Sequence, residues 1–481
     1  MLFNSLSFAI FFPIVFVIYW ILGKKNYRYQ NVFLMIASYY FYAQWDWRFV
    51  FLLAFSTALD YFSGIKIHQA SSKASKKIWL YISVGINLGF LGFFKYYNFF
   101  IDSFAELLGS LGFQAHYPTL QIILPVGISF YTFHGLSYVF DIYNDRIKPD
   151  RNIVDYTLFV SFFPLLVAGP IERATHLLPQ IKRKRQFNYH QVTDGMRQIL
   201  WGLFKKMVIA DNCAIYANEI FSTYETQSGS NLVLGAIFFT FQIYGDFSGY
   251  SDIALGTARM LGFDLLKNFN YPYFSRDIAE FWRRWHISLS SWFKDYLYIP
   301  LGGSKGGNWM RIRNTFIIFL VSGFWHGANW TFIVWGGLNA LFIMPSIIMK
   351  TNRKNLDVVA KGRMFPSIKE GFQVVITFFL AVFCWIFFRA ESVQEAFAYV
   401  YRMFTENLFS FPSLTKSAMA TLILVGFLVV VEWISKEDNY GIEKVFFKAP
   451  TFVRWSFYAF ILLLLGLFME TNETPFIYFQ F

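Results

Sequence analysis

The stretch TFIIFLVSGFWHGANWTFIVWGGLNALFIMPSII, residues 315–348, decides the fold of this chain. Two apolar runs, Thr315 to Phe324 and Trp330 to Ile348, flank a short break at Trp325-His326-Gly327. Long apolar runs are typical of helices that cross a lipid bilayer, which need about 20 residues. Backbone that leaves the helical pattern at that depth is tolerated only against protein or a water-filled cavity. The stretch therefore predicts two membrane helices with a histidine in the break between them, and we expect this histidine to line a wet passage.

The composition of the whole chain agrees with this prediction. Of its 481 residues, 56% are apolar, only 15% are charged and 62 are Phe. A soluble protein of this size could not bury so much apolar surface in one core. We therefore expect an all-α polytopic membrane protein, embedded in a lipid bilayer as a single domain over residues 1–481. The net charge of +12 does not indicate a nucleic acid partner, because the basic residues lie mainly in loops, where the positive-inside rule accounts for them.

The loops also predict how the chain is threaded. Basic residues at 24–28 follow the first apolar run, 5–22, so the N-terminus is expected outside and this loop in the cytoplasm. The strongly basic loop 350–369 is expected in the cytoplasm as well. We predict about eleven spans, plus one or two re-entrant segments such as 155–170. The remaining spans are expected near residues 31–43, 49–63, 78–94, 120–143, 197–221, 231–245, 372–388, 418–433 and 452–468.

Seven histidines are the first candidates for chemistry, because ionisable groups inside a membrane are costly and need a reason. His326 lies between two apolar runs, with Asn329 as a polar neighbour. An imidazole in a wet cavity can take a proton from a hydroxyl at neutral pH, but a histidine that merely caps a helix break fits the pattern equally well. His134 is better explained as a core histidine, and His176 as a partner of Glu172 or of a lipid headgroup. The other three lie in predicted loops: His68, His116 and His190.

A second candidate, His286, lies in the run FWRRWHISLSSWF, residues 281–293. Glu280 and Arg284 are four residues apart and can pair on one helix face. The mixture of Trp, Arg and Ser is typical of a helix at the membrane interface or beside a polar tunnel. Both interpretations stay open.

A third cluster, YGDFSGYSD at residues 244–252, directly follows the apolar run 231–245. Its carboxylates and hydroxyls are able to orient a histidine or bind an acceptor. They are equally able to tie helix ends together, which the pattern slightly favours. The candidate substrate-binding residues of this cluster are Tyr244, Asp246, Ser248, Tyr250 and Asp252.

At these residues the sequence resembles the membrane-bound O-acyltransferase (MBOAT) family, and within it the bacterial alginate O-acetyltransferase-like branch. The similarity covers nearly the whole chain, and the motifs occur in the family's order. They are Leu124–Phe130, Ala168–Ile171, Tyr244–Asp252, Phe281–Gly303 and Gly323–Gly327. The resemblance implies a ring of transmembrane helices, with re-entrant helices, around a central tunnel. The family's near-invariant histidine falls on His326. Its second functional polar position, a histidine in this branch, falls on His286.

The resemblance also implies a reaction. A cytoplasmic acyl thioester, most simply acetyl-CoA, is expected as co-substrate, with no bound cofactor and no metal. His326 is expected to act as general base on an acceptor hydroxyl. His286 is expected to orient the donor or to stabilise developing charge. Arg284, Trp325 and Asn329 are expected to help bind substrate, together with the polar residues of the 244–252 cluster.

The acceptor is expected to be a polysaccharide that is exported across the bacterial inner membrane or belongs to the cell wall. It is reached directly or through an extracytoplasmic partner acetyltransferase or secretion complex. Peptidoglycan acetylation and D-alanyl transfer to teichoic acid are alternatives of the same chemistry. Two alternatives are not enzymatic: a transporter whose intramembrane His and Asp line a solute path, and a scaffold for a secretion complex.

Overall fold

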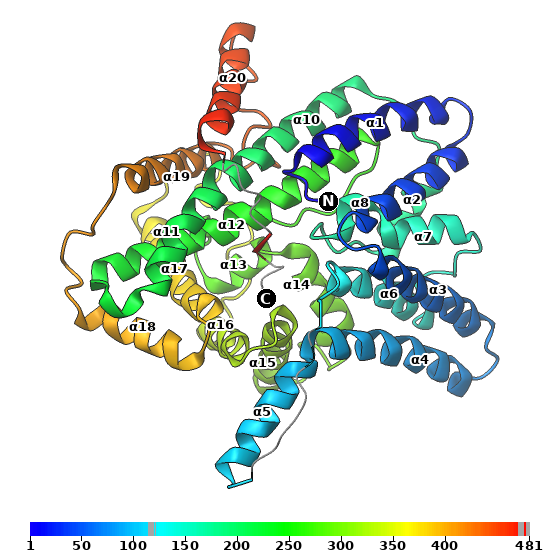
Figure 1. Ribbon diagram of the computed structural model, residues 1–481, viewed down its shortest axis with the longest axis horizontal. Helices are drawn as coiled ribbons and strands as arrows, with labels where there is room; N and C mark the ends of the chain where they lie inside the picture. Colours follow the sequence, from blue (N-terminus) through cyan, green and yellow to red (C-terminus); the bar gives the residue numbers. More distant parts are fainter. Residues whose placement is uncertain (114–119, 121, 470–475, 478–481) are drawn as a thin grey trace. The chain divides into compact units, whose positions relative to one another are not determined.

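The structure, a computed structural model, describes residues 1–113, 120, 122–469 and 476–477. Within these residues all regular secondary structure is helical (Figure 1), which confirms the predicted all-α class. The chain divides into two compact units. Unit 1 contains Met1 and residues 7–187 and 261–265, and unit 2 contains residues 2–6, 188–260 and 266–481. That the two units form one domain stays a prediction.

Unit 1 is built mainly from long apolar helices that begin where the sequence supplies a cap. Asn26, Ser72 and Asn152 each have an extended backbone, and each side chain accepts a hydrogen bond from an N–H in the first turn. The helices are α1 (Leu6–Gly23), α2 (Tyr27–Ala43), α3 (Arg48–Gln69), α4 (Lys73–Leu91), the π-helical η1 (Gly92–Tyr96), α5 (Tyr97–Ser110), α6 (Ile128–Tyr143), α7 (Ile153–Ser161), α8 (Phe163–Leu166) and α9 (Ala174–Ile181).

Unit 2 holds both candidate histidines. Its long helix α12 packs along α10 and α11, and α15 packs along α16. The elements are α10 (Tyr189–Leu203), η2 (Phe204–Ala210), α11 (Asp211–Ser222), η3 (Tyr224–Thr226), α12 (Gly229–Met260), η4 (Pro272–Phe274), α13 (Ile278–Arg284), α14 (Ile287–Phe293), η5 (Lys294–Tyr298), α15 (Gly307–His326), α16 (Trp330–Ile348), α17 (Ile368–Arg389), α18 (Val393–Thr405), α19 (Lys416–Ile434) and α20 (Thr451–Phe468).

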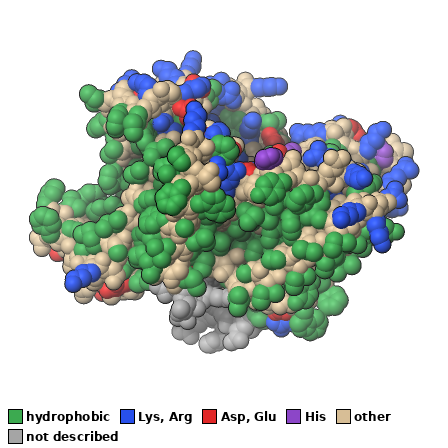
Figure 2. Space-filling view, turned by 90° about the horizontal axis from the view of Figure 1, so that it is seen from above, with side chains coloured by type: hydrophobic (Ala, Val, Ile, Leu, Met, Phe, Trp, Pro, Cys, Tyr) green, Lys and Arg blue, Asp and Glu red, His purple; other side chains and the backbone are tan. Residues whose placement is uncertain are grey.

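Among the described residues, 8 helical stretches are long and apolar enough to cross a membrane, so the chain is a multi-pass membrane protein. The predicted number of about eleven is not confirmed. Figure 2 shows hydrophobic side chains over much of the surface in view, as contact with lipid requires. The stretches are Leu6–Gly23, Arg48–Gln69, Lys73–Ser110, Gly229–Met260, Trp330–Ile348, Ile368–Arg389, Lys416–Ile434 and Thr451–Phe468.

Three predicted segments differ from the structure. Within the described residues of the run 120–143, the helix α6 begins at Ile128, after Gly127 in the left-handed region. The run 155–170 forms two short helices, α7 and α8, and its re-entrant placement stays a prediction. The span expected to end at residue 245 was placed too short, because α12 continues to Met260.

Two glycines allow the helices of the α15–α16 hairpin to pack closely. A Cβ on Gly323 would lie 2.2 Å from the carbonyl oxygen of Phe332, and one on Gly336 would lie 2.2 Å from the carbonyl oxygen of Phe319. Only glycine permits this close approach of backbones. The hairpin therefore fixes where α15 ends, at His326.

We predict that the loop before α17 and the loop after α18 face opposite sides of the membrane. Helix α17 has 22 residues, a length of about 33 Å, which is enough to cross the hydrocarbon core. The exposed residues Lys361 and Phe409 mark its two sides. In intact cells, a membrane-impermeant maleimide should label Phe409→Cys but not Lys361→Cys, with Cys213 and Cys384 replaced by serine. Labelling of both positions from the same side would contradict the crossing.

Candidate active site

His326 is the last residue of α15 and is enclosed by aromatic rings. Its imidazole is 3% exposed. The ring centroids of Trp325, Trp335 and Phe388 lie 4.8, 5.0 and 5.3 Å from that of the imidazole. These rings come from α15, α16 and α17, so three helices build the surroundings of His326. These rings pack against the imidazole, and the expected wet passage to His326 stays a prediction.

The break after His326 is tied down by Asn329. The Asn329 side chain caps α16 by accepting from the Thr331 N–H at 3.0 Å, and it donates to the Glu391 carbonyl at 2.8 Å. Gly327 leaves room for the ring of Phe332, because a Cβ at position 327 would lie 2.0 Å from that ring. The break is thus a structured turn fixed to the end of α17.

His286 occupies a second break, between α13 and α14. Its backbone lies in the left-handed region, at φ 44° and ψ 54°, and its side chain is 1% exposed. Nδ1 lies 2.9 Å from Oδ1 of Asn268. The imidazole packs 4.6 Å from the ring of Phe247 and 6.1 Å from that of Trp325. Trp325 therefore contacts both histidines.

His286 lies outside the candidate spans, in the segment between α12 and α15. Burial lowers the pKa of His286 to about 3, because removal from water disfavours the charged form. The imidazole is therefore neutral at physiological pH.

A basic cavity of about 470 Å³ approaches the histidines along α14 and α15. Ser290 and Ser322 line it, and each is four residues, or about one helical turn, from His286 and His326 respectively. The residues that line it include Trp282, Arg283, Phe293, Lys294, Tyr298, Ser304, Arg311, Thr315, Phe319, Asn352 and Arg353.

A second cavity, also of about 470 Å³, begins beyond the end of α15. Phe388, which packs on His326, lines it together with Phe332. Its polar lining comes from side chains of α12, the start of α16 and the end of α17. These residues are Gln242, Asn329, Thr331, Arg389 and Glu391. Neither His286 nor His326 itself lines either of these two cavities.

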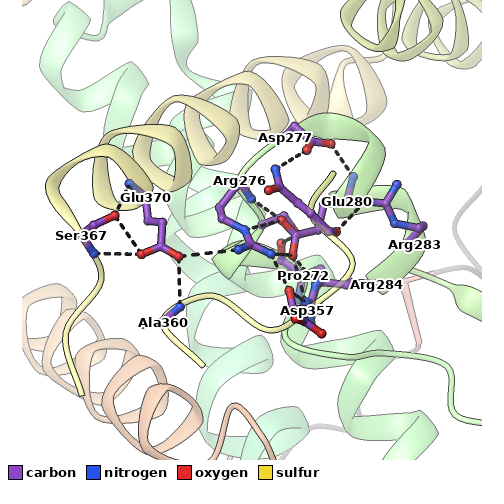
Figure 3. Close-up of polar contacts among 12 residues, drawn as sticks. Pro272, Arg276, Asp277, Glu280, Arg283, Arg284, Asp357, Ala360, Ser367 and Glu370 are labelled. Carbon is purple, nitrogen blue, oxygen red and sulfur yellow. Dashed lines mark hydrogen bonds and ion pairs between the residues drawn. The ribbon is translucent and has the colours of Figure 1, made fainter. Parts of the chain in front are cut away.

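Arg284 lies in an ion-pair network that fixes α13 to the basic loop (Figure 3). Its guanidinium donates to Oε1 of Glu280 at 3.0 and 2.9 Å and to the Asp357 carbonyl at 3.1 Å. Arg276 pairs with the other side of Glu280 and with Glu370 of α17. The predicted Glu280–Arg284 pair is confirmed. The neighbouring Arg283 lines the basic cavity instead, a residue that the sequence did not single out.

The polar residues of the 244–252 cluster lie within α12, and three of them, Tyr244, Asp246 and Asp252, have buried partners. Lys206 Nζ pairs with Asp246 at 2.7 Å and with Asp211 at 2.9 Å. Lys205 pairs with Asp252. The Tyr244 hydroxyl donates to both carboxylate oxygens of Glu432, at 2.9 and 2.8 Å. Ser248 and Tyr250 are buried as well. These contacts tie helices together, and a role in binding substrate stays a prediction.

Two of the remaining histidines, His134 and His176, contact Glu172. In unit 1, buried His134 accepts from the Glu172 N–H at 3.1 Å, and His176 lies 2.8 Å from the Glu172 carboxylate. Both contacts are the structural roles expected for these residues. His116 lies outside the described residues.

The model of the membrane-bound O-acyltransferase (MBOAT) family matches residues 144–388, which include both histidines and both breaks. The chain belongs to this family. It is therefore an O-acyltransferase, and the transporter and scaffold alternatives are set aside.

Curated relatives of this O-acyltransferase carry three kinds of name. A probable alginate O-acetylase AlgI of Pseudomonas aeruginosa is 39% identical over 89% of this chain and 80% of its own length. A peptidoglycan O-acetyltransferase of Helicobacter pylori is 36% identical over 94% of this chain and 87% of its own. A teichoic acid D-alanyltransferase of Bacillus subtilis is 26% identical over 59% of this chain and 73% of its own.

We predict that Asp246→Ala lowers the thermal stability of this O-acyltransferase. We expect a smaller effect on the rate of acyl transfer per correctly folded molecule. Removing one member of a buried ion pair leaves the other charge uncompensated, at a cost of about 3–5 kcal/mol. The thermal denaturation midpoint of the purified protein should fall by several degrees. Glu225→Ala, at an exposed carboxylate, is the control and should leave the midpoint unchanged. An unchanged midpoint with lost activity would favour substrate binding by Asp246.

Proposed function

We propose that this enzyme transfers an acetyl group from a cytoplasmic thioester, most simply acetyl-CoA, to a hydroxyl of an exported or cell-wall polysaccharide. The observation that carries this proposal is a buried histidine on a helix break with a separate cavity on each side of the break. The named activities of the relatives support the same acceptor class: alginate, peptidoglycan and, more distantly, teichoic acid. We place the protein in the bacterial inner membrane with its N-terminus outside.

The basic cavity suits the anionic part of a donor. It combines four cationic side chains with the rings of Trp282 and Tyr298, and phosphate groups are bound by such cations through charge-assisted hydrogen bonds. Arg311 and Ser322, both in its lining, are eleven residues apart on α15, a rise of about 16 Å. A donor whose phosphates lie near Arg311 could therefore extend toward the histidines. The cationic residues are Arg283, Lys294, Arg311 and Arg353.

The second cavity suits a hydroxyl-rich acceptor. It carries amide, hydroxyl, guanidinium and carboxylate groups beside two aromatic rings, which is the combination that binds sugars through hydrogen bonds and apolar ring faces. Helix α17 separates Arg389 from the basic loop before Ile368, so this cavity belongs to the outer side if the loop is cytoplasmic. An extracytoplasmic partner could deliver the acceptor there or carry the acetyl group onward.

In the proposed reaction, the hydroxyl oxygen of the acceptor attacks the thioester carbonyl carbon, and His326 accepts the proton of that hydroxyl. The tetrahedral intermediate collapses, the carbon–sulfur bond breaks, and the thiolate takes the proton back from the imidazolium. An ester and a free thiol result, so atoms and charge balance. The aromatic rings around His326 exclude water, which protects the thioester from hydrolysis.

We predict that His326→Ala abolishes transfer and leaves the fold intact. Inverted membrane vesicles from the protein's own host, given acetyl-labelled acetyl-CoA, should put label into polymer with the native protein only. A general base contributes about 100- to 10,000-fold, so the variant should fall to background. His134→Ala in unit 1 is the control for removal of a buried histidine. Retained transfer in His326→Ala would remove His326 from the mechanism.

We predict that Arg311→Ala raises the KM for acetyl-CoA about 10- to 100-fold and changes kcat less, because a lost charge-assisted hydrogen bond costs about 1.5–3 kcal/mol. The matched control is Arg313→Ala. Arg313 lies two residues away on α15 and hydrogen-bonds to the Leu301 carbonyl and to Asn314. Initial rates at varied acetyl-CoA in the same vesicles decide the matter. Equal KM values for the two variants would rule out the basic cavity as the donor site.

A further inference from the structure

We propose that Asn268 is a positioning residue that holds His286 as the Nδ1–H tautomer, so that Nε2 acts as a hydrogen-bond acceptor during transfer. This inference rests on the proposed function, because it concerns how His286 takes part in it. It also selects among the possible roles of His286. A neutral imidazole whose proton is on Nδ1 cannot donate from Nε2 to a developing oxyanion.

The segment that contains Asn268 grips the break at His286 through the backbone. The Ile287 N–H donates to the Asn268 carbonyl at 2.9 Å. Two residues further along, the Asn270 N–H donates to the Arg284 carbonyl at 2.9 Å. The two chain segments therefore pair across the break, and His286 lies between these two hydrogen bonds.

The amide orientation of Asn268 follows from its neighbours. Its Oδ1 lies 3.4 Å from the Ser288 backbone N–H, which can only donate, and it accepts from the Ser288 hydroxyl at 2.9 Å. Its Nδ2 donates to the Ser251 hydroxyl oxygen at 3.2 Å. Turning the amide over would direct an NH₂ group at a backbone N–H. The atom that faces Nδ1 of His286, at 2.9 Å, is thus an acceptor.

An acceptor at Nδ1 requires the proton to be there, and in neutral imidazole the other nitrogen then carries the lone pair. The rings of Phe247 and Trp325 pack against the imidazole and, like Asn268, carry no charge. These surroundings favour the neutral form. His286 is therefore arranged to accept a hydrogen bond through Nε2, for example from an acceptor hydroxyl that it helps to orient.

The left-handed backbone conformation of His286 is an independent indication that the contacts around it hold it in place. A residue with a Cβ in the left-handed region costs about 1–3 kcal/mol and persists only where its surroundings hold it. Asn268 provides that hold through its carbonyl and its side chain. Its three partners at this break are consecutive: His286, Ile287 and Ser288.

The test compares Asn268→Ala, Asn268→Asp and the matched control Asn270→Ala in the vesicle assay with labelled acetyl-CoA. The Asn270 side chain lies in the same segment but contacts Lys267 Nζ at 2.9 Å. We expect Asn268→Ala to lower kcat at least tenfold with a smaller change in KM, and Asn270→Ala to remain within about twofold. Protein amounts in the membrane are measured for each variant.

Asn268→Asp keeps an acceptor at Nδ1 but adds a negative charge, which raises the basicity of a neighbouring imidazole by about 1–3 pH units. If His286 acts in its neutral form, the acidic limb of the pH–rate profile should move to higher pH in this variant. An unchanged profile would overturn the proposal, even if Asn268→Ala fails to fold. Full activity of Asn268→Ala beside an inactive His286→Ala would also overturn it. An inactive His326→Ala alongside either result would leave the proposed function standing.

Discussion

Charged groups buried away from water must be paired within the protein, and this constraint organises unit 2. Lys206 lies between Asp211 and Asp246. Glu280 lies between Arg276 and Arg284. Leaving any of these charges alone would cost several kcal/mol, so each group fixes the elements that carry it. The first group joins η2, α11 and α12, and the second joins α13 to the basic loop.

His286 depends on these fixed elements. Phe247, which packs on His286, lies on α12 one residue from Asp246. His286 lies two residues after Arg284, at the end of the helix that the second group anchors. Each histidine lies at a helix break, and at each break an asparagine accepts a hydrogen bond from a backbone N–H. Asn268 does so beside His286 and Asn329 does so beyond His326. Precise placement of an imidazole requires such support, because a helix end is otherwise free to fray.

Much of this arrangement follows from the sequence, because it is local. The apolar runs predict the membrane helices, and the break at His326 falls where α15 ends. The spacing of Glu280 and Arg284 predicts their pair. The interior of α12 was not predictable in this way, because the partners that allow Asp246 to lie in mid-helix are far away in the sequence. The polar run was therefore placed after a span, whereas the structure has it inside one.

The same limit applies to the site. Arg283 and Arg284 are adjacent and chemically identical, and only the fold directs one to a cavity and the other to an ion pair. Asn268 carries no motif that marks it, since its contacts with residues 286–288 arise from the pairing of two segments about 18 residues apart. Periodicity and spacing identify which residues share an element. They do not identify which elements meet.

The enclosure of His326 has a mechanistic consequence if it is the base, as proposed. Neither described cavity is lined by its imidazole, and Phe388 lies between it and the second cavity. An acceptor that enters through the second cavity therefore meets the ring of Phe388 before it meets the imidazole. In the proposed reaction, the ring of Phe388 also keeps water of the second cavity away from a thioester bound in the basic cavity. Hydrolysis of the thioester therefore stays slow. Enclosure is thus compatible with catalysis, provided that acceptor binding supplies the free energy that displaces the ring.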